Sequence, residues 1–290
     1  MSAFKSILVP VPDAETGAVP LEIALRLAGS FASHVTALHV RIDPTTAVPL
    51  VGEGMSGAMV EEMIGMAETQ GNLRAKAARA AFDAACARHG TPLLTAPPSD
   101  GLSAEWIDVV GREDDMVSWR GRLADLLVFG HPGGEAEMPA MMTLNAALMA
   151  SGKPLLLCPA EPPATFARSV AIAWNGSAEA ARAVGWAMPL LREAAAVTVL
   201  SVTEQAGRPI DTPADELVTY LAWNGVTATT TVVQAGSSHA GEELLRQTAQ
   251  CGADLLVMGA YTHSRLRQLI LGGVTRHVIS HAPLYVLMCH

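Results

Sequence analysis

The chain has 290 residues, of which half are hydrophobic, 16% are charged and only 4% are aromatic. This length accommodates about two domains of ordinary size, and their cores must consist mainly of alanine, leucine and valine. The formal net charge is −9, with no basic tail. Because nucleic-acid binding depends on lysine and arginine neutralising phosphates, this balance disfavours nucleic acid as a partner.

The N-terminal stretch MSAFKSILVPVPD has one lysine and a short apolar run that ends at a proline, which is not the pattern of a signal peptide. No stretch approaches the roughly 18 uncharged apolar residues of a membrane span. We therefore expect a cytoplasmic protein with no membrane partner.

Four cysteines are scattered without a CxxC pair: Cys86, Cys158, Cys251 and Cys289. In a chain without an export signal these are most simply reduced thiols. Cys289 and the adjacent His290 are weak evidence for a metal site, since structural zinc normally needs four ligands. We expect no metal there.

The chain contains an internal repeat. Four landmarks recur in the same order: KSILV (5–9) with RSVAI (168–172), VTALHV (35–40) with VTVLSV (197–202), ADLLVFG (124–130) with ADLLVMG (253–259), and Pro154 with Pro283. The last two pairs share an offset of 129 residues. This pattern predicts a duplicated domain, with copies at 1–158 and 168–290 joined by a proline-rich linker at 159–167.

Within each copy, short apolar runs alternate with helical patterns, which indicates βαβ units and a parallel sheet. In the second copy we expect strands at 168–174, 196–203, 226–234, 253–259 and 283–289, and helices after Ser177, near 213–223, at about 239–251 and after Gly273. Ser177 is placed as a helix N-cap. The predicted fold is two tandem Rossmann-like α/β domains, each a five-stranded parallel sheet flanked by helices.

The first copy carries a surplus of 33 residues, which includes a predicted loop at 45–57 and a long helix at about 58–90. Four methionines lie on or near this helix at roughly i, i+4 spacing: Met55, Met59, Met63 and Met66. Such a stripe is most often packed into a core, and this is the outcome we expect. The alternative is that it covers a partner or a flexible pocket, because methionine adapts to irregular surfaces.

Ligands of open parallel sheets bind at the carboxyl ends of the strands, where the strand order reverses. In the second copy we expect three segments to converge there: AWNGS (173–177), Val202, and the stretch from Gly259 to Gly273. Glycines there would let a ligand approach and would expose N–H groups at a helix N-terminus, which suits phosphate. Asn175 would hydrogen-bond a base edge or a ribose hydroxyl, and Thr275 would add a hydroxyl.

The duplicated unit, the AWNGS turn and the segment GAYTHSRLRQLILGGVT (259–275) resemble the universal stress protein family. The resemblance implies a tandem member whose domains belong to the adenine nucleotide alpha hydrolase-like group. It also implies ATP or a related adenine nucleotide as ligand, with Mg²⁺ as an optional companion. The family motif is glycine, two residues, glycine, nine residues, glycine, then serine or threonine.

This sequence departs from the motif at two places and from the family's usual residues at a third. Gly259 and Gly272 have the required spacing of thirteen, but Thr262 replaces the middle glycine and Gly273 replaces the final hydroxyl residue. Asn175 stands where nucleotide-binding members usually carry an aspartate. Arg265 and Arg267 would reach phosphate or form a solvated helix face, and a protonated His263 would contact an anion. The predicted nucleotide-binding residues are Ala173, Trp174, Asn175, Val202, Met258, Gly259, Thr262, His263, Arg265, Gly272, Gly273, Val274 and Thr275.

The first copy matches the motif less well. Gly130 corresponds to Gly259, but Thr143 and Leu144 replace the glycine pair, and the stretch HPGGEAEMP adds two acidic residues. Asp13 lies near the place that corresponds to Asn175. We expect the first copy to bind nucleotide weakly or not at all, and to act structurally or as an interaction surface.

The sequence contains no GxSxG elbow, no Walker P-loop and no HExxH motif. His277 and His281 have i, i+4 spacing but no carboxylate companion, so we expect surface histidines rather than a metal site. With no catalytic residues assigned, the protein is expected to be a nucleotide-binding stress-response regulator with at most a slow ATPase activity. The alternatives are a ligand-free interaction protein of the same fold and, less favoured, an enzyme acting on another small molecule.

The resemblance also bears on assembly. Single-domain relatives pair through their last strands, and a tandem chain can reproduce that pairing internally. The segments PLLLCP (154–159) and PLYVLM (283–288) are suited to it. The expected states are a monomer resembling a dimer or a homodimer, acting on a protein partner that is unknown.

Overall fold

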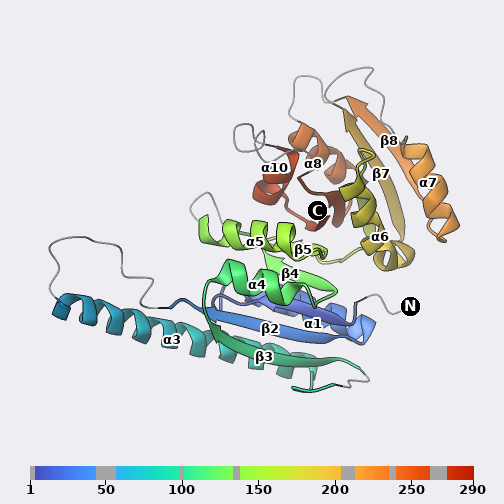
Figure 1. Cartoon of the computed structure of the whole chain (residues 1–290). Coiled ribbons are helices and arrows are strands. Elements are labelled where there is room, and N and C mark those ends of the chain that lie inside the picture. Colours follow the sequence, from blue (N-terminus) through green and yellow to red (C-terminus); the bar gives the residue numbers. More distant parts are fainter. Residues whose placement is uncertain are drawn as a thin grey trace. The chain divides into compact units, whose positions relative to one another are not determined.

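A computed structural model of the chain describes residues 4–43, 57–97, 101–132, 138–203, 213–234, 240–261 and 273–290 (Figure 1). The chain divides into two compact units. The first comprises residues 1–130 and 139–151, and the second comprises residues 131–138 and 152–290. Each is a sheet with helices packed against it, as the alternation of apolar runs and helical patterns predicts.

The strands of the first unit lie in the order β3-β2-β1-β4 and are parallel. They are β1 (Ser6–Pro10), β2 (His34–Arg41), β3 (Ser103–Val110) and β4 (Leu126–Gly130). The helices described with them are α1 (Ala18–Phe31), α3 (Gly57–His89), α4 (Glu113–Gly121) and α5 (Met138–Ala150). In β1 and β4 nearly every residue is buried, which explains their continuous apolar runs.

The strands of the second unit lie in the order β5-β10-β9-β6-β7-β8. They are β5 (Leu155–Cys158), β6 (Ser169–Ala173), β7 (Ala196–Thr203), β8 (Thr229–Gln234), β9 (Leu255–Gly259) and β10 (Tyr285–Cys289). The described helices are α6 (Ala178–Glu193), α7 (Ala214–Trp223), α8 (Ala240–Gln250) and α10 (Val274–His281). Every element predicted for the second copy is present, with ends shifted by at most three residues.

Strand β5 is antiparallel to β10, with Val286 opposite Leu157 and Met288 opposite Leu155. The predicted pairing of the two last strands is therefore confirmed. This pairing also explains why β5, which ends the first sequence repeat, belongs to the second compact unit. All other strand pairs in the second unit are parallel.

The expectation that the methionine stripe packs into a core is wrong for its described members. The exposed fractions of Met59, Met63 and Met66 are 51%, 39% and 67%. Helix α3 contacts its own unit through another face and a later part of its length, where Ala78 and Phe82 are fully buried. Met55 lies outside the described residues.

Candidate nucleotide site

The candidate site lies at the carboxyl ends of the central strands of the second unit. From β6 the chain proceeds outward through β7 and β8, and then returns to place β9 on the other side of β6. The strand order therefore reverses between β6 and β9, which is where ligands of such sheets bind. At this point Ala173 lies opposite both Leu200 and Met258, so the segments 173–177 and 258–259 lie side by side. Val202 lies two residues further along β7.

The turn from β6 into α6 is fixed by two side chains. The Asn175 side-chain oxygen accepts the N–H of Ser177 at 3.2 Å, across Gly176, whose φ is +74°. The Ser177 hydroxyl accepts the N–H of Ala180 at 3.2 Å, which confirms the predicted N-cap. Asn175 is exposed, and its side-chain nitrogen makes no hydrogen bond with the described residues. That nitrogen is therefore available as a donor.

Gly259 is required by the protein's own packing. A Cβ at this position would lie 2.5 Å from the backbone nitrogen of Ala180 and 2.8 Å from the carbonyl carbon of Glu179. Both atoms belong to the first turn of α6, which therefore rests directly on the end of β9. The sequence interpretation, in which this glycine allows a ligand to approach, missed the packing reason for it.

Helix α10 begins at the same edge with an open N-terminus. Gly273 is its N-cap, with an extended backbone (φ −70°, ψ 161°) and no capping side chain. A Cβ on Gly273 would meet no atom of the described residues within 4 Å. The first N–H groups of a helix have no partner within the helix, and together with the helix dipole they favour an anion.

Thr275 closes the side of the site nearest β9. Its side-chain oxygen accepts the N–H of Tyr261 at 3.2 Å, and the residue is only 8% exposed. The hydroxyl proton of Thr275 remains able to donate. Tyr261 itself has a φ of +55°, which is unusual for a residue with a side chain.

Two residues at this edge were missed by the sequence interpretation. Burial raises the pKa of the Tyr261 phenol, and the positive charge of Arg276 opposes that rise. Arg276 is exposed on the first turn of α10, so its charge adds to the positive end of the helix. The position of Arg276 directly after Thr275 could have identified it as a site residue from the sequence. Nothing in the sequence indicated the positive φ of Tyr261.

Three of the remaining predicted residues are described, of which Val274 is the first residue of α10. Trp174 and Met258 are only 7% and 4% exposed, so they offer a ligand their backbones rather than their side chains. The others lie outside the described residues: Thr262, His263, Arg265, Arg267 and Gly272.

The corresponding edge of the first unit has a different helix start. At the offset of 129, Gly273 corresponds to Leu144 and Gly272 to Thr143. These residues lie inside α5, which begins at Met138, and Leu144 is 1% exposed. Backbone N–H groups in a helix interior are already bonded within the helix, so no free amides are presented at this position.

Negative charge also collects at that edge of the first unit. The Asp13 carboxylate accepts the N–H groups of Glu15 and Thr16 at 2.9 and 2.8 Å, and the Thr16 hydroxyl at 2.9 Å. Burial raises the pKa of Glu113, and the charges of Asp114 and Asp13 raise it further. A phosphate placed here would meet carboxylates rather than free donors.

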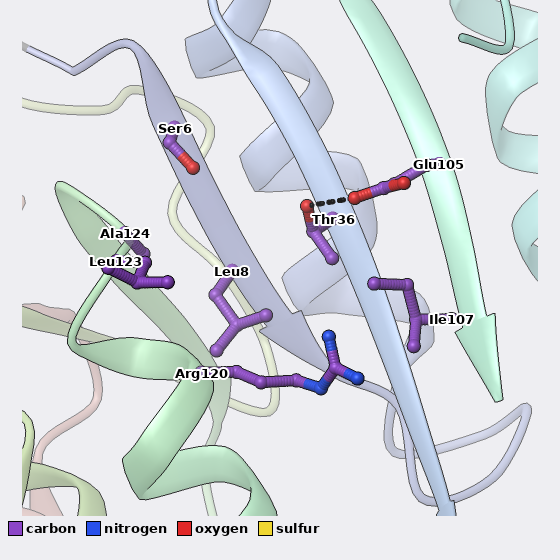
Figure 2. Close-up of a pocket in the computed structure, with 8 residues that line it drawn as sticks. All are labelled: Ser6, Leu8, Thr36, Glu105, Ile107, Arg120, Leu123 and Ala124. Carbon is purple, nitrogen blue, oxygen red and sulfur yellow. Dashed lines mark hydrogen bonds between the residues drawn. The ribbon is translucent and has the colours of Figure 1, made fainter. Parts of the chain in front are cut away.

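A separate hollow of about 170 Å³ lies on one face of the first unit's sheet (Figure 2). It is lined by Ser6, Leu8, Thr36, Glu105, Ile107, Arg120, Leu123 and Ala124. Five of these residues lie on β1, β2 and β3, and the other three come from α4 and the segment before β4, so the hollow belongs to the first unit and does not correspond to the candidate nucleotide site.

Beside this hollow, Glu105 joins a small polar cluster. Its carboxylate accepts the Thr36 hydroxyl at 3.0 Å and lies 3.5 Å from His34 Nε2, while His34 Nδ1 lies 2.9 Å from the Ser103 hydroxyl. The order serine, histidine, carboxylate resembles a hydrolase triad. Ser103 is fully buried, however, so no substrate can reach its hydroxyl, and the cluster serves to pair polar groups on the sheet.

The fold and this edge define a Rossmann-like α/β protein built from two copies of one unit, with an open helix N-terminus at the switch point of the second. Residues 167–290 match the sequence profile of the universal stress protein family. The second half of the chain is therefore identified with the universal stress protein family, and the first half shares the same fold.

Solved structures share this tandem fold at low sequence identity. A universal stress protein of Archaeoglobus fulgidus is 16% identical, with a TM-score of 0.66 over 98% of this chain and 95% of its own. A functionally unknown protein of Pseudomonas aeruginosa is 15% identical, with a TM-score of 0.56 over 99% of this chain and 93% of its own. No curated protein matches the chain.

Among the described residues, no helix combines the length and the apolar character needed to cross a membrane.

Proposed function

We propose that the second unit binds an adenine nucleotide (ATP, ADP or AMP) at the carboxyl edge of β6 and β9. The bound nucleotide would set the conformation or the partner choice of a cytoplasmic stress-response regulator. The observation that carries this proposal is the N-terminus of α10, where no described atom lies beside Gly273 and the first-turn amides have no partner within the helix. Any ATP hydrolysis would be slow, because no general base is assigned at this edge.

The residues present suit the ligand chemically. The first-turn amides of α10 would hold phosphate oxygens, and the guanidinium of Arg276 would balance their charge. The Thr275 hydroxyl retains a proton to donate. The free side-chain nitrogen of Asn175 would donate to an acceptor on the base or the ribose. Mg²⁺, if it accompanies the nucleotide, would be held mainly by the phosphates.

We propose one nucleotide per chain. In the first unit the equivalent residues lie inside α5, and Asp13, Glu113 and Asp114 would repel phosphate. That unit would therefore serve as structure or as an interaction surface.

A second candidate function is a ligand-free interaction protein. The observation that favours it is that two polar atoms of the edge already have partners within the chain. The Asn175 side-chain oxygen is bonded to Ser177 N, and the Thr275 oxygen to Tyr261 N.

The two functions are separated by mass spectrometry of the small molecules released when freshly purified protein is denatured. We expect an adenine nucleotide near one per chain in the wild type, and its loss in Gly273→Val, whose side chain would project into the open space. Gly185→Val is the matched control, because a Cβ at Gly185, on α6, also meets no described atom within 4 Å. Unfolding midpoints establish that both variants are folded.

Two nucleotides per chain would contradict the assignment of the first unit. A wild-type protein that releases none, and gives no heat with ATP, ADP or AMP in calorimetry, would favour the interaction protein instead.

A further inference from the structure

Helix α3 carries a second apolar row that its own unit does not bury. The row runs along the helix with alternating spacings of four and three residues: Met59, Met63, Met66, Gln70, Leu73, Ala77, Ala80, Ala84 and Ala87. Every member is exposed. This is the a/d spacing of a coiled-coil seam, with glutamine as its one polar residue.

The seam is distinct from the face that α3 packs against the first unit. On that face Ala78 and Phe82 are fully buried, and the Phe82 ring lies 5.5 Å from that of Trp106 on β3. On the seam, Met66 and Leu73 are 67% and 64% exposed. Single exposed apolar residues are ordinary, but a continuous row of them marks an interaction surface.

The charges of α3 are segregated along its length. Three glutamates lie in its first half: Glu61, Glu62 and Glu68. In the second half, basic side chains predominate: Arg74, Lys76, Arg79 and Arg88, against Asp83. A second copy of this helix would meet opposite charges only if it ran antiparallel, because a parallel copy would set glutamate against glutamate.

We propose that α3 pairs antiparallel with α3 of a second copy of this chain, in a register centred on Glu68. In this register three residues of one copy face three of the other: Met63 faces Leu73, Met66 faces Gln70 and Met59 faces Ala77. In the outermost of these layers, the large Met59 therefore faces the small Ala77. The two Gln70 side chains occupy adjacent central layers, where a polar residue fixes register in coiled coils.

The same register sets Glu62 beside Lys76 of the second copy, once on each side of the twofold axis. Both side chains are exposed in the single chain. Glu62 and Lys76 occupy the same heptad position beside the seam, and in an antiparallel pair this position on one helix faces the same position on the other. The register therefore satisfies apolar spacing and charge together.

Sedimentation velocity across a concentration series, with charge-swap variants, tests the pairing. Glu62→Lys and Lys76→Glu each bring like charges together at both of the symmetry-related 62–76 contacts, and each should raise the dissociation constant of the dimer about tenfold. The double variant should bring that constant back to within about threefold of the wild-type value. Glu68→Lys is the matched control, since position 68 lies on the opposite side of the helix from the seam, and it should leave the dimer unchanged. Met66→Glu should abolish the dimer without changing the unfolding midpoint.

Oxidative cross-linking tests the orientation. In the proposed register Thr69 faces Thr69 of the second copy, so Thr69→Cys should form a disulfide-linked dimer and Met66→Cys should not. A parallel pair would give the reverse result. The unsubstituted chain, oxidised in the same way, controls for Cys251, which is partly exposed, and for the buried Cys86.

A chain that stays monomeric at every concentration would overturn the proposal. So would a dimer that survives Met66→Glu, because that dimer would use another surface. Preferential linking through Met66→Cys would overturn the antiparallel register.

Discussion

At the scale of single residues, Glu113 shows how the first unit differs from the second. It begins α4, a position where the helix dipole ordinarily favours a carboxylate. Burial nevertheless raises its pKa, as do the charges of Asp114 and Asp13, and the hydrogen bond from the Thr143 hydroxyl at 3.4 Å only partly offsets them. Ionised Glu113 therefore destabilises the native state.

This predicts a pH-dependent effect of Glu113→Gln. The native pKa lies above the unfolded value of 4.5, so the stabilising contribution of Glu113 is complete below pH 4.5 and is lost as the pH rises through the native pKa. The glutamine still accepts the Thr143 hydroxyl but cannot ionise. We expect a higher urea midpoint than wild type at pH 7, and a difference that shrinks towards pH 4.

Glu68→Gln, at an exposed position, is the control for that experiment and should leave the urea midpoint unchanged at both pH values. If the Glu113→Gln variant were less stable than wild type at pH 7, the claim that ionised Glu113 destabilises the native state would be wrong.

At the scale of elements, the contact of α6 with β9 determines the shape of the candidate site. The first turn of α6 passes so close to Gly259 that no side chain fits, and Ser177 caps that turn. Since β6 and β9 flank the switch point, this contact sets where the N-terminus of α6 lies relative to that of α10. A comparable close approach occurs in the first unit, where a Cβ on Gly130 would lie 2.9 Å from the carbonyl oxygen of Thr16, just before α1.

We predict that Gly259→Ala destabilises the protein by roughly 1–3 kcal/mol, the usual cost of forcing atoms into a packed interior. Gly273→Ala, at an element end with open space, should change stability by no more than about 0.5 kcal/mol. Urea unfolding of both variants at pH 7 provides the measurement. If Gly259→Ala and Gly273→Ala had equal urea midpoints, the contact between α6 and residue 259 would accommodate the added methyl group without cost.

At the scale of the whole chain, β10 holds the second unit together. It pairs with β9 on one side and β5 on the other, and all five of its residues are buried. Strand β5 belongs to the first sequence repeat, so the repeat boundary and the compact unit do not coincide. The second compact unit therefore contains sequence from both repeats.

Leu287→Pro should disrupt the second unit selectively. Proline removes a ladder N–H in the middle of a sheet, where it is essentially not tolerated. In hydrogen exchange we expect faster exchange over residues 152–203, while residues 57–97 keep their protection. Leu287→Met, which conserves volume, should behave nearly as wild type. Equal loss of protection in both units would show that they unfold together.

Much of the fold was predictable because its signals are local. Apolar runs, helical periodicity and the repeated landmarks located the strands and helices, and Ser177 identified the start of α6. The glycine at 273 likewise marked the start of α10. These features depend on backbone propensities and spacing within a few residues, which the sequence displays directly.

The sequence by itself determined the two repeats and the order of their elements, and it predicted that the segments 173–177 and 258–259 meet at one edge of the sheet. Only the tertiary structure decided that Gly259 is required by α6, that the equivalents of the glycine pair lie inside α5, and that Met63 and Met66 are exposed. Each of these depends on atoms far apart in the chain. Local spacing establishes which face of a helix is apolar, whereas long-range packing decides what, if anything, covers it.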